Sequence, residues 1–323
     1  MKNMMTIALL GATALTTAAP AFADEIIFAH GANPGNPRFD AAEMFADLVP
    51  ACTGGETTVN VAPSATMGND VEMLTSVSAG VIQMSANSQG PLAQIVPEVG
   101  MLGLPFLFED LPSVWEVLDG EVGEMIDQKA QNAGLKVLTF WDNGIRHVSH
   151  VSKNVPTPAD LEGMQIRTPS DEVTIATFEA LGASPAPLAW SDLPTALQSG
   201  VFEGQENPLT NIYSAKLHEI TPYITLTGHK YESTPVVASM AWWSGLDEDT
   251  QGCIENAAKS AGWYQRGLSL SQGKNLRETM EAEGATFAEV EDRQAFIDAT
   301  ASVYEQYEGE FGELISALRE ATQ

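Results

Sequence analysis

Segments with strand-like and helix-like patterns alternate twice along this chain, and no other feature of the sequence constrains its fold as strongly. In the first series, apolar or alternating runs at 25–29, 57–62 and 81–85 flank helical patterns at 39–49 and 70–78. Such a series builds a parallel sheet covered by helices. Because 323 residues exceed one usual hydrophobic core, we predict an α/β protein with two lobes.

The second series predicts the other lobe and the connections between the two. Strands are expected at 135–141, 164–167, 201–204 and 236–243. Helices are expected at 171–181, near 192–200, and at 209–220, 292–307 and 311–322, with one long helix or two abutting ones at 247–284. Ser170 and Ser191 are the expected N-caps of the first two helices. A chain that crosses between two lobes more than once leaves a cleft between them.

The N-terminus has the three parts of a secretory signal peptide. Lys2 is the only charge before Asp24, residues 4–21 are apolar or small, and residues 21–23 match the A-x-A cleavage pattern. The apolar run is too short and too rich in Ala and Thr to span about 30 Å of hydrocarbon. We therefore expect residues 1–23 to be removed during export and the mature protein to be periplasmic.

The charge balance argues against two classes of partner. The chain has 15 basic and 43 acidic residues, which gives a formal net charge of −28. Such a surface repels nucleic acid and anionic lipid, and no basic stripe overrides it. We expect neither as a partner.

The two cysteines, Cys52 and Cys253, leave one structural question open. An oxidising compartment permits a disulfide between them. Sequence alone does not place their Cα atoms within the required ~4.4–6.8 Å. Both the bridged and the free forms are compatible with the sequence.

Signatures of catalysis are absent from the sequence. It contains no G-x-S-x-G, H-E-x-x-H or C-x-x-C motif. Residues 267–274 resemble a phosphate-binding loop, but five residues instead of four separate the glycines, and Asn275 stands where Ser or Thr belongs. The five histidines are His30, His147, His150, His218 and His229. His147 and His150 are close in sequence, but no cluster of cysteines or carboxylates accompanies them, so polar packing is favoured over a metal site. We therefore expect that the protein is not an enzyme and that it binds neither a metal nor a cofactor.

Two arginines stand out in a chain so poor in cations. Arg167 closes the strand expected at 164–167, and Arg146 lies just past the strand expected at 135–141. Ligands of doubly wound sheets sit at the carboxyl ends of strands, and a guanidinium matches a carboxylate in two parallel hydrogen bonds. The alternative is that both arginines make structural ion pairs.

Longer motifs relate the chain to a known family. Residues 184–208 read SPAPLAWSDLPTALQSGVFEGQENP, and residues 161–167 read LEGMQIR. With the matching motifs at 63–73, 90–108 and 227–229, the chain resembles the DctP-type solute-binding proteins of TRAP (tripartite ATP-independent periplasmic) transporters. The resemblance extends, in order, over nearly the whole mature chain.

That resemblance implies a fold and a function. It implies two α/β domains joined by hinge strands and long helices, with the ligand in the interdomain cleft. We expect domain I at 24–145 plus 233–272, and domain II at 146–232 plus 273–323. The implied function is to capture a small organic acid in the periplasm and deliver it to the small and large permease subunits of a TRAP transporter. We expect a monomer.

The resemblance also implies which residues bind the ligand. Arg167 would form the main salt bridge to a ligand carboxylate, Asn207 would bond the same group, and Trp190 would pack on the carbon skeleton. The remaining candidates occupy a second arginine position and positions that face or line the cleft: Arg146, Asn87, Ser88, Asp70, Tyr231 and Glu232.

Two positions depart from familiar relatives. Ser88 replaces an acidic residue of sialic-acid-binding members, and Gly31 replaces a polar contact there and an acidic one in ectoine-binding members. Without these groups a zwitterion with a cationic centre loses partners, which disfavours sialic acid and ectoine as ligands. Small carboxylates, sugar acids, hydroxy or keto acids and sulfonates stay candidates. Two other functions are alternatives. One is a periplasmic lyase or hydrolase of the same architecture, for which the sequence offers no nucleophile with a base. The other is a sensor domain that binds the same ligand and signals to a receptor.

Export is directly testable. Protein isolated from the periplasm should begin at Asp24 or within a residue or two of it, because cleavage follows the small residues at 21–23. N-terminal sequencing measures this. An intact Met1 on membrane-bound protein would contradict the prediction.

Overall fold

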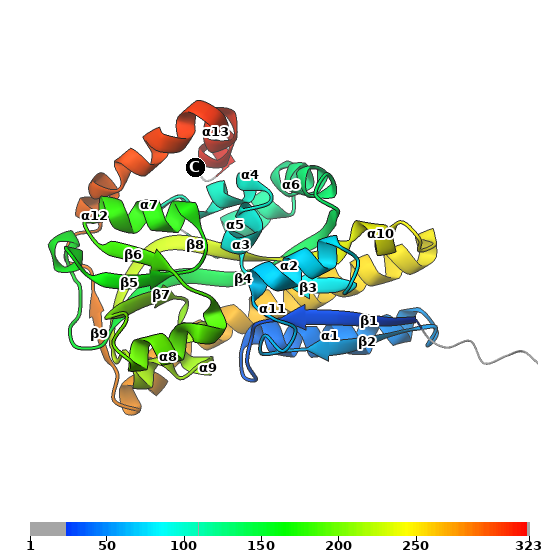
Figure 1. Ribbon diagram of the computed structural model, residues 1–323, viewed down its shortest axis with the longest axis horizontal. Helices are drawn as coiled ribbons and strands as arrows, with labels where there is room; N and C mark the ends of the chain where they lie inside the picture. Colours follow the sequence, from blue (N-terminus) through cyan, green and yellow to red (C-terminus); the bar gives the residue numbers. More distant parts are fainter. Residues whose placement is uncertain (1–23, 109, 322–323) are drawn as a thin grey trace, which may run out of the picture.

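The computed structural model describes residues 24–108 and 110–321 and shows an α/β protein (Figure 1). This confirms the fold class expected from the alternating pattern. The signal peptide expected at 1–23 lies outside the described residues. Within the described part of the chain, no helix is both long and apolar enough to cross a membrane.

In the described part of the chain, nine strands form one mixed sheet. Their order is β2-β1-β3-β8-β4-β7-β5-β6, with β9 paired to β8. The strands are β1 (Asp24–His30), β2 (Thr57–Ala62), β3 (Met84–Ala86), β4 (Leu135–His150), β5 (Gln165–Thr168), β6 (Ser184–Pro187), β7 (Gly204–Asn207), β8 (Tyr223–Ser239) and β9 (Thr286–Glu289). We call the part built on β1–β3 the first lobe and the part built on β5–β7 and β9 the second lobe; Figure 1 shows them at opposite ends of the sheet.

Two long strands join the lobes. β4 and β8 pair antiparallel from Leu135 opposite Ser239 to His150 opposite Tyr223, with register shifts near the middle. At one of these shifts Gly144 adopts a φ of 122°, which a side chain would oppose. The two strands therefore carry both the connection between the lobes and its irregular midpoint.

The sequence underestimated these polar strands. We expected strands at 135–141 and 201–204, whereas β4 continues to His150 and β7 runs from Gly204 to Asn207. Apolar patterns do not reveal them because their polar side chains bond one another in the interior; Gln205 Nε2, for example, donates to Ser149 Oγ at 2.6 Å. The strand expected at 236–243 ends at Ser239, opposite the first residue of β4, and the chain then turns into a helix.

Thirteen helices and four 3₁₀ turns accompany the sheet within the described residues. The helices are α1 (Pro37–Cys52), α2 (Asp70–Ser78), α3 (Gln89–Ala93), α4 (Pro97–Gly100), α5 (Leu111–Leu118), α6 (Glu121–Gln131), α7 (Glu172–Ala180), α8 (Leu193–Gln198), α9 (Leu209–Ser214), α10 (Met240–Trp243), α11 (Glu248–Ala282), α12 (Arg293–Ala299) and α13 (Ala301–Ala321). The 3₁₀ turns are η1 (Met101–Gly103), η2 (Pro158–Leu161), η3 (Trp190–Asp192) and η4 (Leu217–Glu219).

Helices cover both faces of the first lobe. On one face α1 and the first half of α11 bury Phe28, Phe45 and Trp141 with their neighbours. On the other, the helices between β3 and β4 and the distant α13 enclose a second apolar cluster. The second half of α11 packs in the second lobe, where Leu276 and Met280 join the core around α8 and α9. The helical stretch expected at 247–284 is thus one long helix and not two, and it spans both lobes.

Two expected N-caps are wrong by one residue. Asp171, not Ser170, caps α7: its Oδ1 accepts from Val173 N at 3.1 Å. Asp192 holds the N-cap position of α8 in place of Ser191, because a 3₁₀ turn precedes the helix. The helix expected at 209–220 also divides, since Lys216 has a φ of 54°. Adjacent Ser-Asp pairs offer two competent caps, and the sequence does not choose between them.

A disulfide joins the end of α1 to the start of α11. Cys52 and Cys253 are bonded, with Cα atoms 5.8 Å apart and a sequence separation of 201. This resolves the question that the sequence left open. The bridge holds together the two helices that cover one face of the first lobe.

Removing this bridge should destabilise the protein. Cross-links that close long loops restrict the unfolded chain most, and typical contributions are about 2–4 kcal/mol. We expect the double variant Cys52→Ser, Cys253→Ser to lose about that much free energy of unfolding, measured by urea denaturation under non-reducing conditions.

A reductant provides the control for this measurement. Dithiothreitol should bring the wild-type protein to the stability of the double variant and leave the variant unchanged. Equal stabilities of the oxidised wild type and the variant would contradict the prediction.

Candidate functional site

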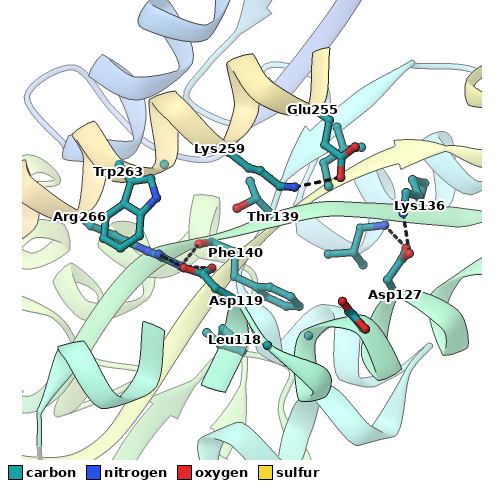
Figure 2. Close-up of a pocket in the computed structure, with 16 residues that line it drawn as sticks. Leu118, Asp119, Asp127, Lys136, Thr139, Phe140, Glu255, Lys259, Trp263 and Arg266 are labelled. Carbon is teal, nitrogen blue, oxygen red and sulfur yellow. Dashed lines mark hydrogen bonds and ion pairs between the residues drawn. The ribbon is translucent and has the colours of Figure 1, made fainter. Parts of the chain in front are cut away.

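One large cavity has no unpaired cation among the described residues that line it. It lies between α6, β4 and α11 and contains about 970 Å³ of space free of protein atoms (Figure 2). Each cation on its wall is paired with a carboxylate: Arg266 with Asp119, Lys136 with Asp127 and Lys259 with Glu255. An anionic ligand would have to displace one of these carboxylates, so this cavity is a poor candidate for the acid-binding site.

A smaller cavity lies between the two lobes. It contains about 470 Å³ of space free of protein atoms, part of it open to solvent. Its walls come from the loop after β1, the starts of α1 and α2, the ends of β5 and β7, the turn η3 and helix α9. The lining residues are Gly31, Ala32, Asn33, Asn36, Arg38, Asp70, Ser88, Arg146, Arg167, Pro169, Trp190, Asn207, Asn211 and Ser214.

Arg167 enters this cavity as a buried cation with only a neutral acceptor. It lies in β5, one residue before the strand ends, and is 3% exposed. Its Nε and Nη2 both donate to the carbonyl of Leu188, at 2.8 and 2.6 Å. Among residues 24–108 and 110–321 it forms no ion pair with a carboxylate. Burial lowers the pKa of Arg167 to about 10, which is the expected response of a charge without a close counterion.

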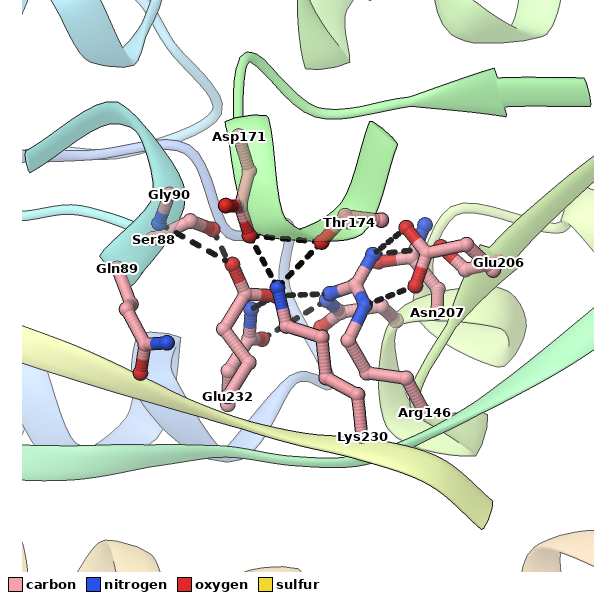
Figure 3. A network of polar contacts seen from close by, with 12 residues as sticks. Ser88, Gln89, Gly90, Arg146, Asp171, Thr174, Glu206, Asn207, Lys230 and Glu232 are labelled. Carbon is pink, nitrogen blue, oxygen red and sulfur yellow. Dashed lines mark hydrogen bonds and ion pairs between the residues drawn. The ribbon is translucent and has the colours of Figure 1, made fainter. Parts of the chain in front are cut away.

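Arg146 is the opposite case, because its charge is already compensated. Its guanidinium is 2% exposed and bonds the carboxylates of Glu206 on β7 and Glu232 on β8 (Figure 3). Its Nη2 also donates to the Glu206 carbonyl at 2.5 Å. Burial opposes the charge, but the two carboxylates outweigh burial and raise the pKa of Arg146 above its usual value. Most of its donors are therefore used within the protein.

Arg38 is a second cation that lacks a carboxylate partner. It lies in the first turn of α1 and is 5% exposed. Nη2 donates to Asn143 Oδ1 at 3.0 Å and to Thr234 Oγ1 at 2.8 Å, whereas Nε has no hydrogen-bond partner in the described part of the chain. Burial lowers the pKa of Arg38. Sequence reasoning missed this residue.

A chain of amides crosses the cavity from one lobe to the other. Asn36, before α1, donates to Asn211 Oδ1 at 2.8 Å, and Asn211 donates to Asn207 Oδ1 at 3.1 Å and to Asn143 Oδ1 at 2.9 Å. Amide groups both donate and accept. This wall can therefore bond hydroxyl and carboxylate oxygens of a ligand.

The other predicted site residues divide into two groups. Ser88, Asp70 and Trp190 line the cavity together with Arg146, Arg167 and Asn207. Asn87 stands behind the wall and donates to Asp70 Oδ1 at 2.8 Å. Glu232 also stands behind it, and Tyr231 lies farther off, where its hydroxyl donates to Asp142 at 2.8 Å.

Comparison with known proteins decides the family. The model of the bacterial extracellular solute-binding protein family 7, DctP, matches residues 28–310. The chain belongs to this family. This confirms the resemblance inferred from the motifs, the two-lobed fold and the expectation of a non-enzymatic transport component.

Individual relatives agree over most of the chain. A protein from Sinorhizobium fredii is 46% identical over 276 residues, 85% of this chain but 51% of its own, so this chain spans about half the length of that relative. The 2,3-diketo-L-gulonate-binding periplasmic protein of Escherichia coli is 34% identical over 289 residues, 90% of this chain and 88% of its own. A TRAP periplasmic solute-binding protein from Polaromonas sp. JS666, bound to D-erythronate, has a TM-score of 0.89 at 30% identity and covers 92% of this chain and 98% of its own.

One sequence signal could have revealed Arg38 in this family 7 protein. Arg167 was predicted to bind the ligand because ligands of doubly wound sheets lie at the carboxyl ends of strands. The loop after β1 lies at the carboxyl end of a parallel strand as well, and Arg38 is among only 15 basic residues. The seven residues between the end of β1 and Arg38 hid the connection, because sequence does not show how the loop folds back.

Substitution of Arg167 should weaken ligand binding sharply. Removing one partner of a buried charged pair costs about 2–5 kcal/mol, so Arg167→Ala should lower affinity for a bound acid by roughly 30- to several-thousand-fold. Arg167→Lys should recover part of this, because an ammonium lacks the planar fork. Isothermal titration calorimetry measures both affinities.

Circular dichroism must show that each of these variants is folded. A folded Arg167→Ala protein that binds within threefold of wild type would contradict the role of Arg167. The anchor would then be sought at Arg38 or Arg146.

Proposed function

We propose that this protein captures a small organic acid in the periplasm and delivers it to the membrane subunits of a TRAP transporter. The observation that carries the proposal is the buried guanidinium of Arg167, which faces an interlobe cavity without a carboxylate partner in the described chain. A buried, unpaired charge is unfavourable. A ligand carboxylate would relieve that cost through a charge-assisted pair.

The cavity supports a division of roles among its residues. Arg167 anchors the carboxylate, Asn207 bonds the same group, and the flat face of Trp190 packs on the carbon skeleton. Arg146 acts on the ligand mainly through long-range electrostatics, in combination with Glu206 and Glu232, since those carboxylates occupy most of its hydrogen-bond donors. The polar walls leave room for ligand hydroxyl groups.

The fold supports a hinge between two domains. We place domain I at 24–145 plus 233–272 and domain II at 146–232 plus 273–323. The register shifts of β4 at 142–144 and 146–148 flank the first boundary, and α11 crosses the last one. Opening at these positions would separate the cavity walls, because lining residues come from both sides; such hinge closure around a ligand is common in binding proteins.

The relatives support an acid as the ligand. One binds 2,3-diketo-L-gulonate and another holds D-erythronate, and both compounds are small carboxylates. Membership in a family of solute-binding proteins favours transport over the sensor role. The periplasmic location follows from the same family and from the expected signal peptide.

A thermal-shift screen tests the function. A ligand that binds only the folded state stabilises it by about 2.7 kcal/mol at 100 times its Kd, so at least one acid in a broad panel should raise Tm by several degrees. The panel contains sugar acids, hydroxy and keto acids, dicarboxylates and sulfonates. Arg167→Ala is the matched control and should lose the shift.

Delivery needs a second assay. Uptake of the acid that binds, measured in proteoliposomes containing the TRAP membrane subunits, should depend on added wild-type protein. No shift with any acid in the panel, or uptake without the binding protein, would contradict the proposed function.

A further inference from the structure

The charges around the cleft point to the kind of acid it accepts. Three guanidinium groups and three carboxylates line the cavity or bond its lining residues: Arg38, Arg146, Arg167, Asp70, Glu206 and Glu232. Their formal charges sum to zero before any ligand enters. A monoanionic ligand therefore leaves one excess negative charge in the closed cleft, whereas a dianion leaves two.

Asp70 is the carboxylate on the cavity wall itself. Glu206 and Glu232 are fully buried and already bonded to Arg146, so neither is available to a ligand. Asp70 is the first residue of α2 and is half-buried. Asn87 donates to its Oδ1 at 2.8 Å, which fixes the carboxylate and leaves the other oxygen for the cavity.

Arg38 and Arg167 could in principle hold one carboxylate each. Asp70 argues against this use of Arg38, because it is the charged group that acts most strongly on the Arg38 guanidinium, whose Nη2 also donates to Asn143 and Thr234. The charge of Asp70 also acts on both arginines: it raises the pKa of each, against the lowering effect of burial. A second ligand carboxylate near Arg38 would face this fixed negative charge in a cavity from which closure excludes water, where charges interact more strongly.

We propose that Asp70 makes the cleft selective for a monocarboxylate that carries hydroxyl groups, and selective against a dicarboxylate. Its free oxygen accepts a hydrogen bond from a ligand hydroxyl, and its charge repels a second carboxylate. The amide chain through Asn36, Asn207 and Asn211 supplies further partners for hydroxyl groups. This inference rests on the proposed function, since it assigns the ligand class of the same site.

Pairs of acids that differ in one group test the inference. D-Erythronate and meso-tartrate differ only by a terminal CH₂OH against a carboxylate, and D-gluconate and D-glucarate differ in the same way. Butyrate lacks the hydroxyls of erythronate. For at least one pair, wild-type protein should bind the monoacid at least tenfold more tightly than the diacid, and erythronate more tightly than butyrate, in calorimetric titrations at constant ionic strength.

Asp70→Asn should reverse the discrimination. The amide keeps the shape of the side chain but loses the charge, so we expect monoacid affinity to fall roughly tenfold and diacid affinity to rise roughly tenfold, each equivalent to about 1.4 kcal/mol. The ratio of the two Kd values should thus change by about 100-fold. Arg38→Gln removes a positive charge from the same cavity and should shift the ratio in the opposite direction.

Asp47→Asn is the matched control. Asp47 is exposed on α1, outside the cavity, and the same substitution there should leave both affinities unchanged. Melting of each variant without ligand verifies its fold. A wild-type preference for the diacids, an Asp70→Asn ratio equal to that of wild type, or no binding of either member of any pair would overturn the inference. The wider acid panel decides the proposed function separately.

Discussion

A single buried cation organises the centre of the molecule. Arg146 projects from β4 between Glu206 on β7 and Glu232 on β8, so it joins three strands at the point where the lobes meet. Breaking a buried pair of this kind by removing one partner costs about 3–5 kcal/mol. The network also holds other elements in place, since Glu232 accepts from Gly90 N at 3.4 Å and from Asn143 Nδ2 at 3.1 Å.

This arrangement separates structural charges from binding charges. Because Arg146 has its own carboxylates, the attraction left for an anion comes from Arg167 and Arg38, which are held by neutral groups. The protein has a net charge of −28, so its overall electrostatic potential is negative. Guanidinium groups without carboxylate partners inside the cleft make the potential near them more positive than at the surface. An acid can then be attracted at close range by a protein whose surface is strongly negative.

The same strands serve mechanics and recognition. β4 and β8 join the lobes, contain the register shifts of the proposed hinge, and supply Arg146 and Glu232. The covering helices divide similarly: the disulfide ties α11 to α1 in the first lobe, while the far half of α11 packs in the second. A change in the separation of the lobes would therefore displace parts of α11 and of the cleft wall at the same time.

The sequence by itself determined the local elements and the family. Strand β2 and helix α2 match the expected 57–62 and 70–78 because alternation and the Asn69–Glu72 capping box are local signals. Motifs and strand ends led to Arg167, Trp190, Asn207 and Asp70, all of which line the cavity. Only the tertiary structure decided which arginine is compensated, that Arg38 reaches the cleft, that Tyr231 lies away from it, and that polar segments such as β7 are strands. These properties depend on partners far away in the sequence, such as Glu206 for Arg146, 60 positions away. A one-dimensional pattern carries no information about such contacts.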